Sequence, residues 1–230
     1  MSEEFLDQFI VGSLLGDAYV SKEKRFGFTH TEKQSEYFYH KVNILKDCGL
    51  APKIRESRTK GNFINELFVK PANTLTARIS IGRRWKNLRD LWYPEGKKIV
   101  PADIKITPIT LAYWYMDDGS ANKRTKFTDK RRNEIREGGP WVNQFRLHLD
   151  GFDHKSQDLL QTKLKELEID SWFYTKKDNG NRQLLITQSE SKRKFKELVM
   201  PIILNVPSML YKIDLETSFK VHELCGTETT

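Results

Sequence analysis

Two stretches of apolar residues recur at helical spacing, and each of them runs into an aspartate. The first begins after Ser2, a residue type that caps helices, and its apolar side chains repeat every three or four positions up to Asp17. The second begins at Thr107-Pro108, a capping threonine followed by proline at the first helical position, and stops at Gly119, just after Asp118. The pattern predicts two apolar helices, each with an acidic residue at its end.

Two glycines share one face of the first predicted helix, because Gly12 and Gly16 lie four residues apart. Glycine inside a helix costs stability, and the close approach of another backbone is a good reason to keep it. We therefore expect a second backbone to pack against this face. The alternative is a poorly optimised helix.

The segments that follow the two helices resemble each other. Residues 26–30 and 145–149 both alternate in polarity as strands do, and a shift of 119 positions places Phe26 on Phe145. The same shift aligns the apolar positions of a helix and of the next strand. The two aspartates are only 101 positions apart, so the second half carries 18 additional residues. This pattern predicts an internal duplication with an insertion at 121–141.

The remaining periodic segments give each half a mixture of helices and antiparallel strands, which is an α+β architecture. Strands are expected at 53–57, 62–70, 77–81, 172–176 and 183–188, and helices at 35–48, 84–92, 155–167 and 191–204. The insertion at 121–141 is rich in Lys and Arg, and we expect a solvated loop or a basic flap over a phosphate backbone.

Composition points to a globular protein with a polyanionic partner. Hydrophobic residues make up 38% of the 230 residues and charged residues 30%, while the net charge of +8 suggests nucleic acid as strongly as it suggests a merely basic surface. The two cysteines and five histidines show no spacing typical of a metal site. We expect neither a membrane-spanning segment nor an N-terminal targeting signal.

Both predicted helices resemble the signature helices of the LAGLIDADG homing endonucleases, in the subclass that carries two motifs in one chain. The segments are FIVGSLLGDAYV at residues 9–20 and LAYWYMDDGS at residues 111–120. The resemblance implies two pseudo-symmetric αββαββα-type halves, with antiparallel DNA-binding sheets and the two helices packed side by side at the centre. We expect an N-terminal half at 1–103, a C-terminal half at 104–225 and a disordered tail at 226–230.

The resemblance also implies a site-specific endonuclease that hydrolyses one phosphodiester on each DNA strand. Two similar halves can present one site to each strand of a pseudo-symmetric duplex, and Mg²⁺ prefers carboxylate oxygens. Asp17 and Asp118 would be the catalytic carboxylates and metal ligands, assisted by the backbone carbonyls of Gly16 and Asp117. Mg²⁺ is the expected ion, and Mn²⁺ or Ca²⁺ would suit the same ligands. Taken singly, either aspartate could simply end a helix.

Two departures from the family pattern bear on the packing of the helices. Ala18 stands where the family often has glycine after the first aspartate, and Tyr113 stands where it often has glycine opposite Gly12. Neither change removes an acidic residue. We therefore expect an asymmetric helix contact with catalysis retained.

Two lysines occupy similar contexts in the two halves. Lys98 and Lys212 each follow a proline and a short run and precede an apolar residue, and family members often carry a basic residue here. The resemblance implies a catalytic role close to the active-site waters, because a lysine can stabilise developing phosphate charge. Lys97 is the alternative to Lys98. The other interpretation is that both are ordinary surface lysines without a catalytic role.

DNA contacts are expected on the strands, because an antiparallel ribbon fits the major groove and alternate residues face the bases. Most such contacts go to phosphates, and a solvated surface role is the alternative for each residue. The candidates are Arg25, Thr29, Arg55, Arg58, Lys60, Lys70, Arg78, Arg146, His148, Lys176, Lys177, Arg182, Gln183 and Gln188.

Two other functions fit the same resemblance: an RNA-binding intron maturase, and a non-catalytic DNA-binding regulator. Retention of both Asp17 and Asp118 favours cleavage over the maturase reading. The expected partner is double-stranded DNA with a long specific target, with intron RNA as the alternative and no membrane. We expect a monomer that acts inside an organelle or a microbial cell.

Overall fold

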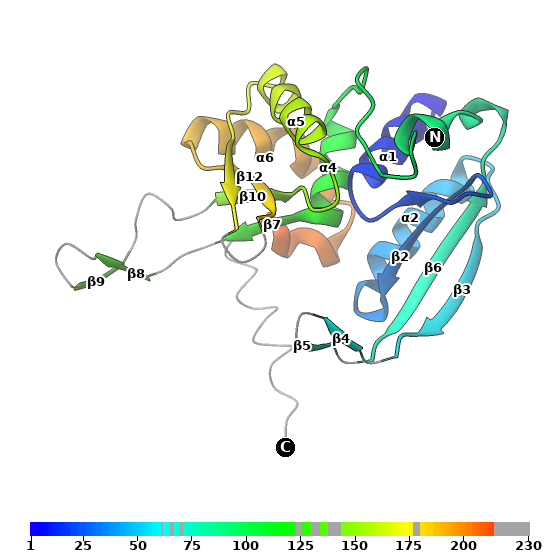
Figure 1. The fold of residues 1–230 in the computed structure, drawn as a ribbon, viewed down its shortest axis with the longest axis horizontal. Coiled ribbons are helices and arrows are strands. Elements are labelled where there is room, and N and C mark those ends of the chain that lie inside the picture. Colours follow the sequence, from blue (N-terminus) through cyan, green and yellow to red (C-terminus); the bar gives the residue numbers. More distant parts are fainter. Residues whose placement is uncertain are drawn as a thin grey trace.

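The chain folds, in a computed structural model, into two four-stranded antiparallel sheets with a pair of helices between them (Figure 1). The structure describes residues 1–60, 62–64, 67–69, 71–122, 126–129, 134–137, 144–176 and 180–213. The expected tail at 226–230 lies outside these residues. No helix in the described ranges is long and apolar enough to cross a membrane. The α+β class expected from the sequence is confirmed.

The central pair consists of α1 (Glu3–Leu15) and α4 (Pro108–Asp118), which lie side by side (Figure 1). Both helices begin where the capping residues predict, because Ser2 accepts a hydrogen bond from the Phe5 backbone and Thr107 accepts one from Thr110. The apolar residues of both helices are largely buried, whereas Glu3 and Glu4 at the start of α1 are exposed.

The first sheet has the order β1-β2-β6-β3, and the second has the order β7-β10-β12-β11 when it is followed from the strand after α4. Each order therefore begins with the short strand that follows a central helix. The first sheet is formed by β1 (Tyr19–Val20), β2 (Arg25–Thr31), β3 (Lys53–Arg58) and β6 (Asn73–Ser80). The second is formed by β7 (Gly119–Asn122), β10 (Gln144–His148), β11 (Trp172–Thr175) and β12 (Arg182–Ile186).

The identical strand order supports the predicted duplication, and the helices support it further. Helix α2 (Ser35–Asp47) becomes α5 (His154–Glu166) when both of its ends are shifted by the 119 positions found in the sequence. The second half continues with α6 (Ser189–Ile203) and the 3-10 turn η3 (Pro207–Lys212). The division at residue 103 stays a prediction.

Several short elements differ from the expectation. The helix expected at 84–92 is instead a 3-10 turn, η2 (Arg83–Trp85), followed by the short helix α3 (Leu88–Trp92). The strand expected at 62–70 is a hairpin of β4 (Asn62–Ile64) and β5 (Leu67–Val69). In the insertion expected as a loop, a second hairpin joins β8 (Lys126–Asp129) to β9 (Glu134–Glu137). Elements of three to five residues carry too few periods to show their type in a sequence.

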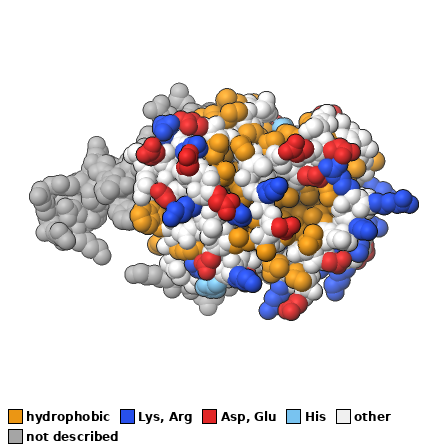
Figure 2. All heavy atoms as spheres, turned by 90° about the horizontal axis from the view of Figure 1, so that it is seen from above, with side chains coloured by type: hydrophobic (Ala, Val, Ile, Leu, Met, Phe, Trp, Pro, Cys, Tyr) orange, Lys and Arg blue, Asp and Glu red, His pale blue; other side chains and the backbone are white. Residues whose placement is uncertain are grey.

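One hydrophobic core runs through both halves and includes the apolar residues of both central helices. Figure 2 shows the molecule of Figure 1 from above. On this face, acidic and basic side chains are interspersed over much of the surface. That mixed face contrasts with the outer face of the first sheet, where basic residues gather, as described below.

Candidate active site at the ends of the two central helices

The two aspartates singled out in the sequence lie at equivalent positions, one at the end of each central helix. Asp17 lies two residues beyond the end of α1 and its side chain is 42% exposed, while Asp118 is the last residue of α4 and is partly buried. Burial, followed by the negative charges of Asp17 and Asp117, raises the pKa of Asp118 to about 7. The pKa of Asp17 is also raised, first by burial and then by Asp117. The helix ends thus concentrate negative charge.

Each of the two predicted lysines binds the end of the helix in its own half. Lys98 donates to the backbone carbonyls of Gly16 and Ala18, at 3.0 Å each. Lys212 donates to the carbonyl of Asp117 at 3.1 Å and to that of Met116. These carbonyls lie at helix C-termini, where a cation is favoured.

Burial is the largest influence on both ammonium groups. It lowers the pKa of Lys98 to about 8, and it lowers the pKa of Lys212 as well, although the nearby aspartates act in the opposite direction. The sequence paired these lysines from their contexts, and the structure places them in matching positions. The lysines also occupy the two carbonyls considered as metal ligands, those of Gly16 and Asp117. A carbonyl oxygen has two lone pairs, so it can accept a second partner.

Asp117 does more than offer its carbonyl, because its side chain crosses into the first half. The carboxylate accepts hydrogen bonds from the Tyr37 hydroxyl at 2.8 Å and from the Lys41 ammonium at 2.9 and 3.1 Å. The Asp17 backbone N–H also donates to it, at 3.4 Å. The side chains of Lys41 and Asp117 are fully buried, so the charge of Asp117 is already compensated.

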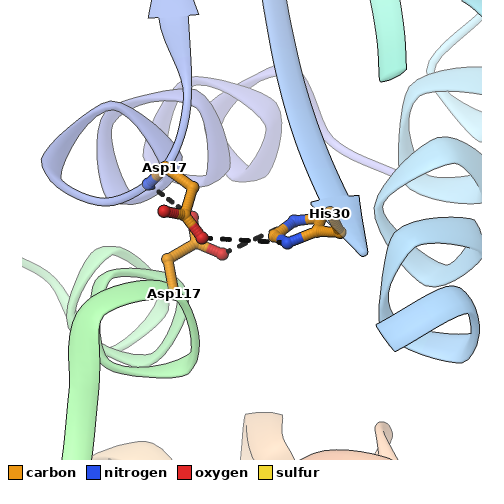
Figure 3. Close-up of side chains that lie close together, drawn as sticks. All are labelled: Asp17, His30 and Asp117. Carbon is orange, nitrogen blue, oxygen red and sulfur yellow. Dashed lines mark hydrogen bonds and ion pairs between the residues drawn. The ribbon is translucent and has the colours of Figure 1, made fainter. Parts of the chain in front are cut away.

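His30, on strand β2, completes this group, and Figure 3 shows its ring facing Asp17 and Asp117. Its Nδ1 lies 3.7 Å from Asp17 Oδ2 and its Nε2 lies 3.9 Å from Asp117 Oδ1. Burial, followed by the charge of Lys41, lowers the pKa of His30 to about 4, so the ring is neutral at neutral pH. The ligand atoms that Asp17, His30 and Asp117 offer all lie within 4.8 Å of one another.

The arrangement suits a hard divalent cation. Carboxylate and carbonyl oxygens are the ligands that Mg²⁺, Mn²⁺ and Ca²⁺ prefer, and a cation would relieve the repulsion that raises the pKa of Asp118. Asp17 and Asp118 are better placed to ligate than Asp117, because Lys41 and Tyr37 already bind the Asp117 carboxylate.

Sequence reasoning missed His30, Tyr37 and Lys41. One signal was available: the 119-position shift places these polar residues on Leu149, Ser156 and Leu160 of the second half. The polar residues of the first half thus correspond to mainly apolar residues in the second half. This difference marks a place where the two halves have diverged.

Four of the predicted DNA-contacting residues share the outer face of the first sheet. Strand register places Arg55 beside Thr76, which in turn lies beside Thr29, and it places Arg78 beside Gly27. Arg25 lies on the same face, and a hollow of about 470 Å³ there is lined by Arg25, Lys53, Arg55 and Arg78 among others. These side chains make the outer face of the first sheet basic, and their contact with DNA phosphates stays a prediction.

Three further candidates lie on the outer face of the second sheet: Arg146, His148 and Gln183. The Gln183 amide and the His148 ring form a hydrogen bond of 2.8 Å across the strands. Lys176 follows β11 and pairs with Asp150 at 3.6 Å.

The other candidates are not gathered on these two faces. Arg58 follows the alternation to the helix-covered side, and Arg182 points to α5, where it pairs with Asp158 at 2.9 Å. Lys60 is exposed beyond β3, and Gln188 precedes α6. Lys70 and Lys177 lie outside the residues whose side chains are described.

Comparison with known proteins bears on both fold and family. The model of the LAGLIDADG DNA endonuclease family matches residues 7–195. Among solved structures, the homing endonuclease I-WcaI bound to its DNA recognition sequence matches with a TM-score of 0.67 and 23% identity, covering 92% of this chain and 86% of that one. At this identity the likeness shows the fold.

Among curated proteins, the matches extend over most of this chain. Protein RecA of Mycolicibacterium chitae is 27% identical over 215 residues, which are 90% of this chain and 45% of that RecA, so the chain spans less than half of its length. The probable intron-encoded endonuclease 1 of Wickerhamomyces canadensis is 26% identical over 90% of this chain and 83% of its own. The cytochrome b mRNA maturase bI2 of Debaryomyces hansenii is 28% identical over 52% of this chain and 47% of its own.

Proposed function

Because the chain belongs to the LAGLIDADG DNA endonuclease family, we propose that it is a homing endonuclease that cuts both strands of one specific DNA site. The observation that carries the proposal is the placement of Asp17 and Asp118 at equivalent ends of two paired helices, one in each half. Two carboxylates in two related halves match the two phosphodiesters that a double-strand cut requires.

In this proposal, Asp17 and Asp118 each hold a divalent cation, with the carbonyls of Gly16 and Asp117 beside them. When bound, the cation neutralises phosphate charge and lowers the pKa of the attacking water. The repulsion within the cluster supports this role, because it favours the binding of positive charge. Mg²⁺ is the proposed ion, and Mn²⁺ or Ca²⁺ would suit the same oxygen ligands.

Lys98 and Lys212 fix the ends of the helices and place a positive charge next to each aspartate. Their hydrogen bonds to the helix-terminal carbonyls hold the backbone from which the carboxylates project. Because both ammonium groups are buried, solvent screens them weakly, and they stabilise charge that develops on a phosphate bound at the aspartates. We assign them a catalytic role for this reason.

The duplex is proposed to lie along the outer faces of the two sheets. In this proposal, Arg25, Arg55 and Arg78 contact phosphates, and Thr29, Arg146 and His148 contact base edges. Gln183 is 2% exposed and holds the His148 ring through their hydrogen bond. One chain carries both halves, so a monomer suffices. Action inside an organelle or a microbial cell stays a prediction.

A second candidate is an intron maturase, which the partial match to a cytochrome b mRNA maturase favours. Such a protein would bind structured RNA and would not need Asp17 and Asp118. A non-catalytic DNA-binding regulator would bind a duplex and leave it intact. Cleavage therefore separates the proposed function from both alternatives.

The test is incubation of the purified protein with a randomised plasmid library and Mg²⁺, followed by sequencing of the linearised molecules. A homing endonuclease enriches one long site, and EDTA abolishes the cutting. If the library stays intact while the protein retains a structured intron RNA or an uncut duplex, the maturase or the regulator takes the place of the endonuclease.

A further inference from the structure

At the positions that the 101-position shift relates, the side chains that cross between the two central helices come from α4. The side chains of Tyr113 and Asp117 of α4 both extend into the first half. There the Tyr113 hydroxyl forms a hydrogen bond of 2.9 Å with the His40 ring, and the Asp117 carboxylate accepts a hydrogen bond from Lys41. The residues that correspond to them by the 101-position shift are Gly12 of α1 and Gly16, which caps its C-terminus, and glycines have no side chains to extend in return.

The glycine at position 16 is required by this arrangement. A Cβ added there would overlap the Cβ of Asp117 and would lie 2.8 Å from its Oδ2. Helix α1 therefore provides the space through which the Asp117 carboxylate passes. The second half receives no equivalent carboxylate, because Gly16 is the counterpart of Asp117.

The two half-sites consequently differ in what lies behind each aspartate. Behind Asp17 stand His30, Tyr37 and Lys41, together with the intruding Asp117. The corresponding residues of the second half are Leu149, Ser156 and Leu160. Leu149 and Leu160 are fully buried in the core, and the Ser156 hydroxyl accepts a hydrogen bond from the Val100 backbone.

The link from this group to Asp17 is direct. Asp117 accepts the Asp17 N–H and is itself held by Tyr37 and by both hydrogen bonds from Lys41. A buried ion pair contributes little net stability when it is compared with apolar residues of the same shape. What such a pair can supply is a fixed geometry, because both oxygens of the carboxylate are bound by buried donors.

We propose that Asp117, Lys41 and Tyr37 are positioning residues for Asp17, so that the two strands of the target are cut by unequal sites. The inference rests on the proposed endonuclease function. It adds that the strand cut at the Asp17 site depends on this buried group more strongly than the strand cut at the Asp118 site.

Two double variants separate positioning from mere folding. Lys41→Leu gives position 41 the residue type of its second-half counterpart Leu160, and Asp117→Gly gives position 117 the residue type of its first-half counterpart Gly16. Together they remove the acceptor for the Asp17 N–H. Lys41→Met/Asp117→Asn removes both charges but retains an oxygen that can accept this N–H. Leu160→Met is the matched control in the second half, at the position equivalent to Lys41.

The experiment measures the single-turnover cleavage rate of each strand on a duplex that carries the selected site, with a different end label on each strand. We expect Lys41→Leu/Asp117→Gly to slow one strand about tenfold or more and to change the other about twofold at most, because small displacements of a catalytic group cost large factors. The slowed strand should be the one that Asp17→Asn affects more. Lys41→Met/Asp117→Asn should restore most of that rate, and Leu160→Met should leave both strands unchanged.

The outcomes distinguish the two proposals. If the wild-type protein cuts neither strand of any site, the endonuclease function itself fails. If the wild type cuts but Lys41→Leu/Asp117→Gly slows both strands equally, or slows neither, the positioning role is wrong while the endonuclease function stands. A variant that melts before the assay temperature is replaced by Tyr37→Phe, which removes a single donor to Asp117, and the same split between strands is required of it.

Discussion

Asp118 is a carboxyl group held where its negative charge is unfavourable. Burial and the neighbouring Asp17 and Asp117 raise its pKa to about 7, compared with an ordinary value near 4. Carboxyl groups with a strongly raised pKa are common at functional sites, where the binding of a substrate or cation offsets the repulsion between like charges.

The first prediction concerns the stability of the metal-free protein carrying Asp118→Asn. The raised pKa means that the native state holds a proton between about pH 4 and 7 that the unfolded chain releases, so stability falls as the pH rises through this window. Asparagine removes this penalty. In EDTA, the variant should melt at a higher temperature than the wild type at pH 8, and the difference should shrink towards pH 4.

Added Mg²⁺ provides the control for this prediction, because it should raise the melting temperature of the wild type and have less effect on Asp118→Asn. An equal difference between the two proteins at pH 4 and pH 8 would show that burial does not perturb Asp118.

The second prediction concerns the two lysines that bind the helix ends. Lys98→Met and Lys212→Met each remove a buried ammonium group beside the aspartates, so the cleavage rate should fall about a hundredfold, the loss typical of an electrostatic catalytic donor. Affinity for the uncut duplex should change little. Lys97→Met is the matched control, since Lys97 is exposed, and comparable loss in that variant would move the catalytic assignment to Lys97.

At the residue scale, the sequence predicts the groups that repeat between halves and misses those that do not. Asp17, Asp118, Lys98 and Lys212 each have a counterpart in the other half, and the motif context exposes them. Lys41 is an ordinary helix residue in the sequence, and its partner lies 76 positions away. Lys41 lies on α2 and Asp117 on α4, so tertiary packing brings the two together, and no local pattern encodes that contact.

At the scale of elements, the contact between α1 and α4 depends on a glycine without a side chain in α1 and a large side chain opposite it in α4. A Cβ added to Gly12 would lie 2.5 Å from the Thr110 carbonyl oxygen and 3.0 Å from the Tyr113 Cβ. The sequence predicted close approach at this face, and the structure confirms it. It also explains how Tyr113 is accommodated where the family often has glycine.

The third prediction is that Gly12→Ala destabilises the protein by about 1–3 kcal/mol or more, because the new methyl group overlaps backbone that cannot move independently. Chemical denaturation gives the free energy of unfolding. Gly82→Ala is the control, since a Cβ there meets nothing within 4 Å, and its effect should stay within about 0.5 kcal/mol. Equal effects at the two glycines would contradict the close helix contact.

Elements with local signals were predictable, and elements without them were not. The starts of α1 and α4 follow from Ser2 and from Thr107-Pro108, because a cap acts within one turn. Strand β1 has two residues and exists because it pairs with β2, so tertiary contacts rather than its own sequence define it. The same holds for the turn and short helix that replace the single helix expected at 84–92.

At the scale of the whole molecule, the charges that give the net value of +8 are distributed unevenly over the surface. The outer face of the first sheet gathers Arg25, Lys53, Arg55 and Arg78 around one hollow, whereas charges of both signs mix on the face seen in Figure 2. Uneven charge of this kind favours binding of a polyanion over general solubility.

The fourth prediction is that Arg55→Ala reduces the salt dependence of DNA binding by about one unit in the slope of log affinity against log salt concentration, because one phosphate contact is lost. The affinity should fall for all sequences alike. Arg193→Ala removes a basic residue from α6 that pairs with Glu197, and it should leave the slope unchanged. An unchanged slope in Arg55→Ala would place the duplex elsewhere.

In the proposed function, Asp17 and Asp118 are the two catalytic carboxylates of a double-strand endonuclease. The most direct measurement is cleavage of the selected duplex with Mg²⁺ by the wild type, Asp17→Asn and Asp118→Asn, with binding of the uncut duplex measured in parallel in EDTA. We expect the wild type to cut both strands, and we expect each variant to bind the duplex normally but to fail to make the double-strand cut. Undiminished double-strand cleavage by either variant would contradict the proposed function.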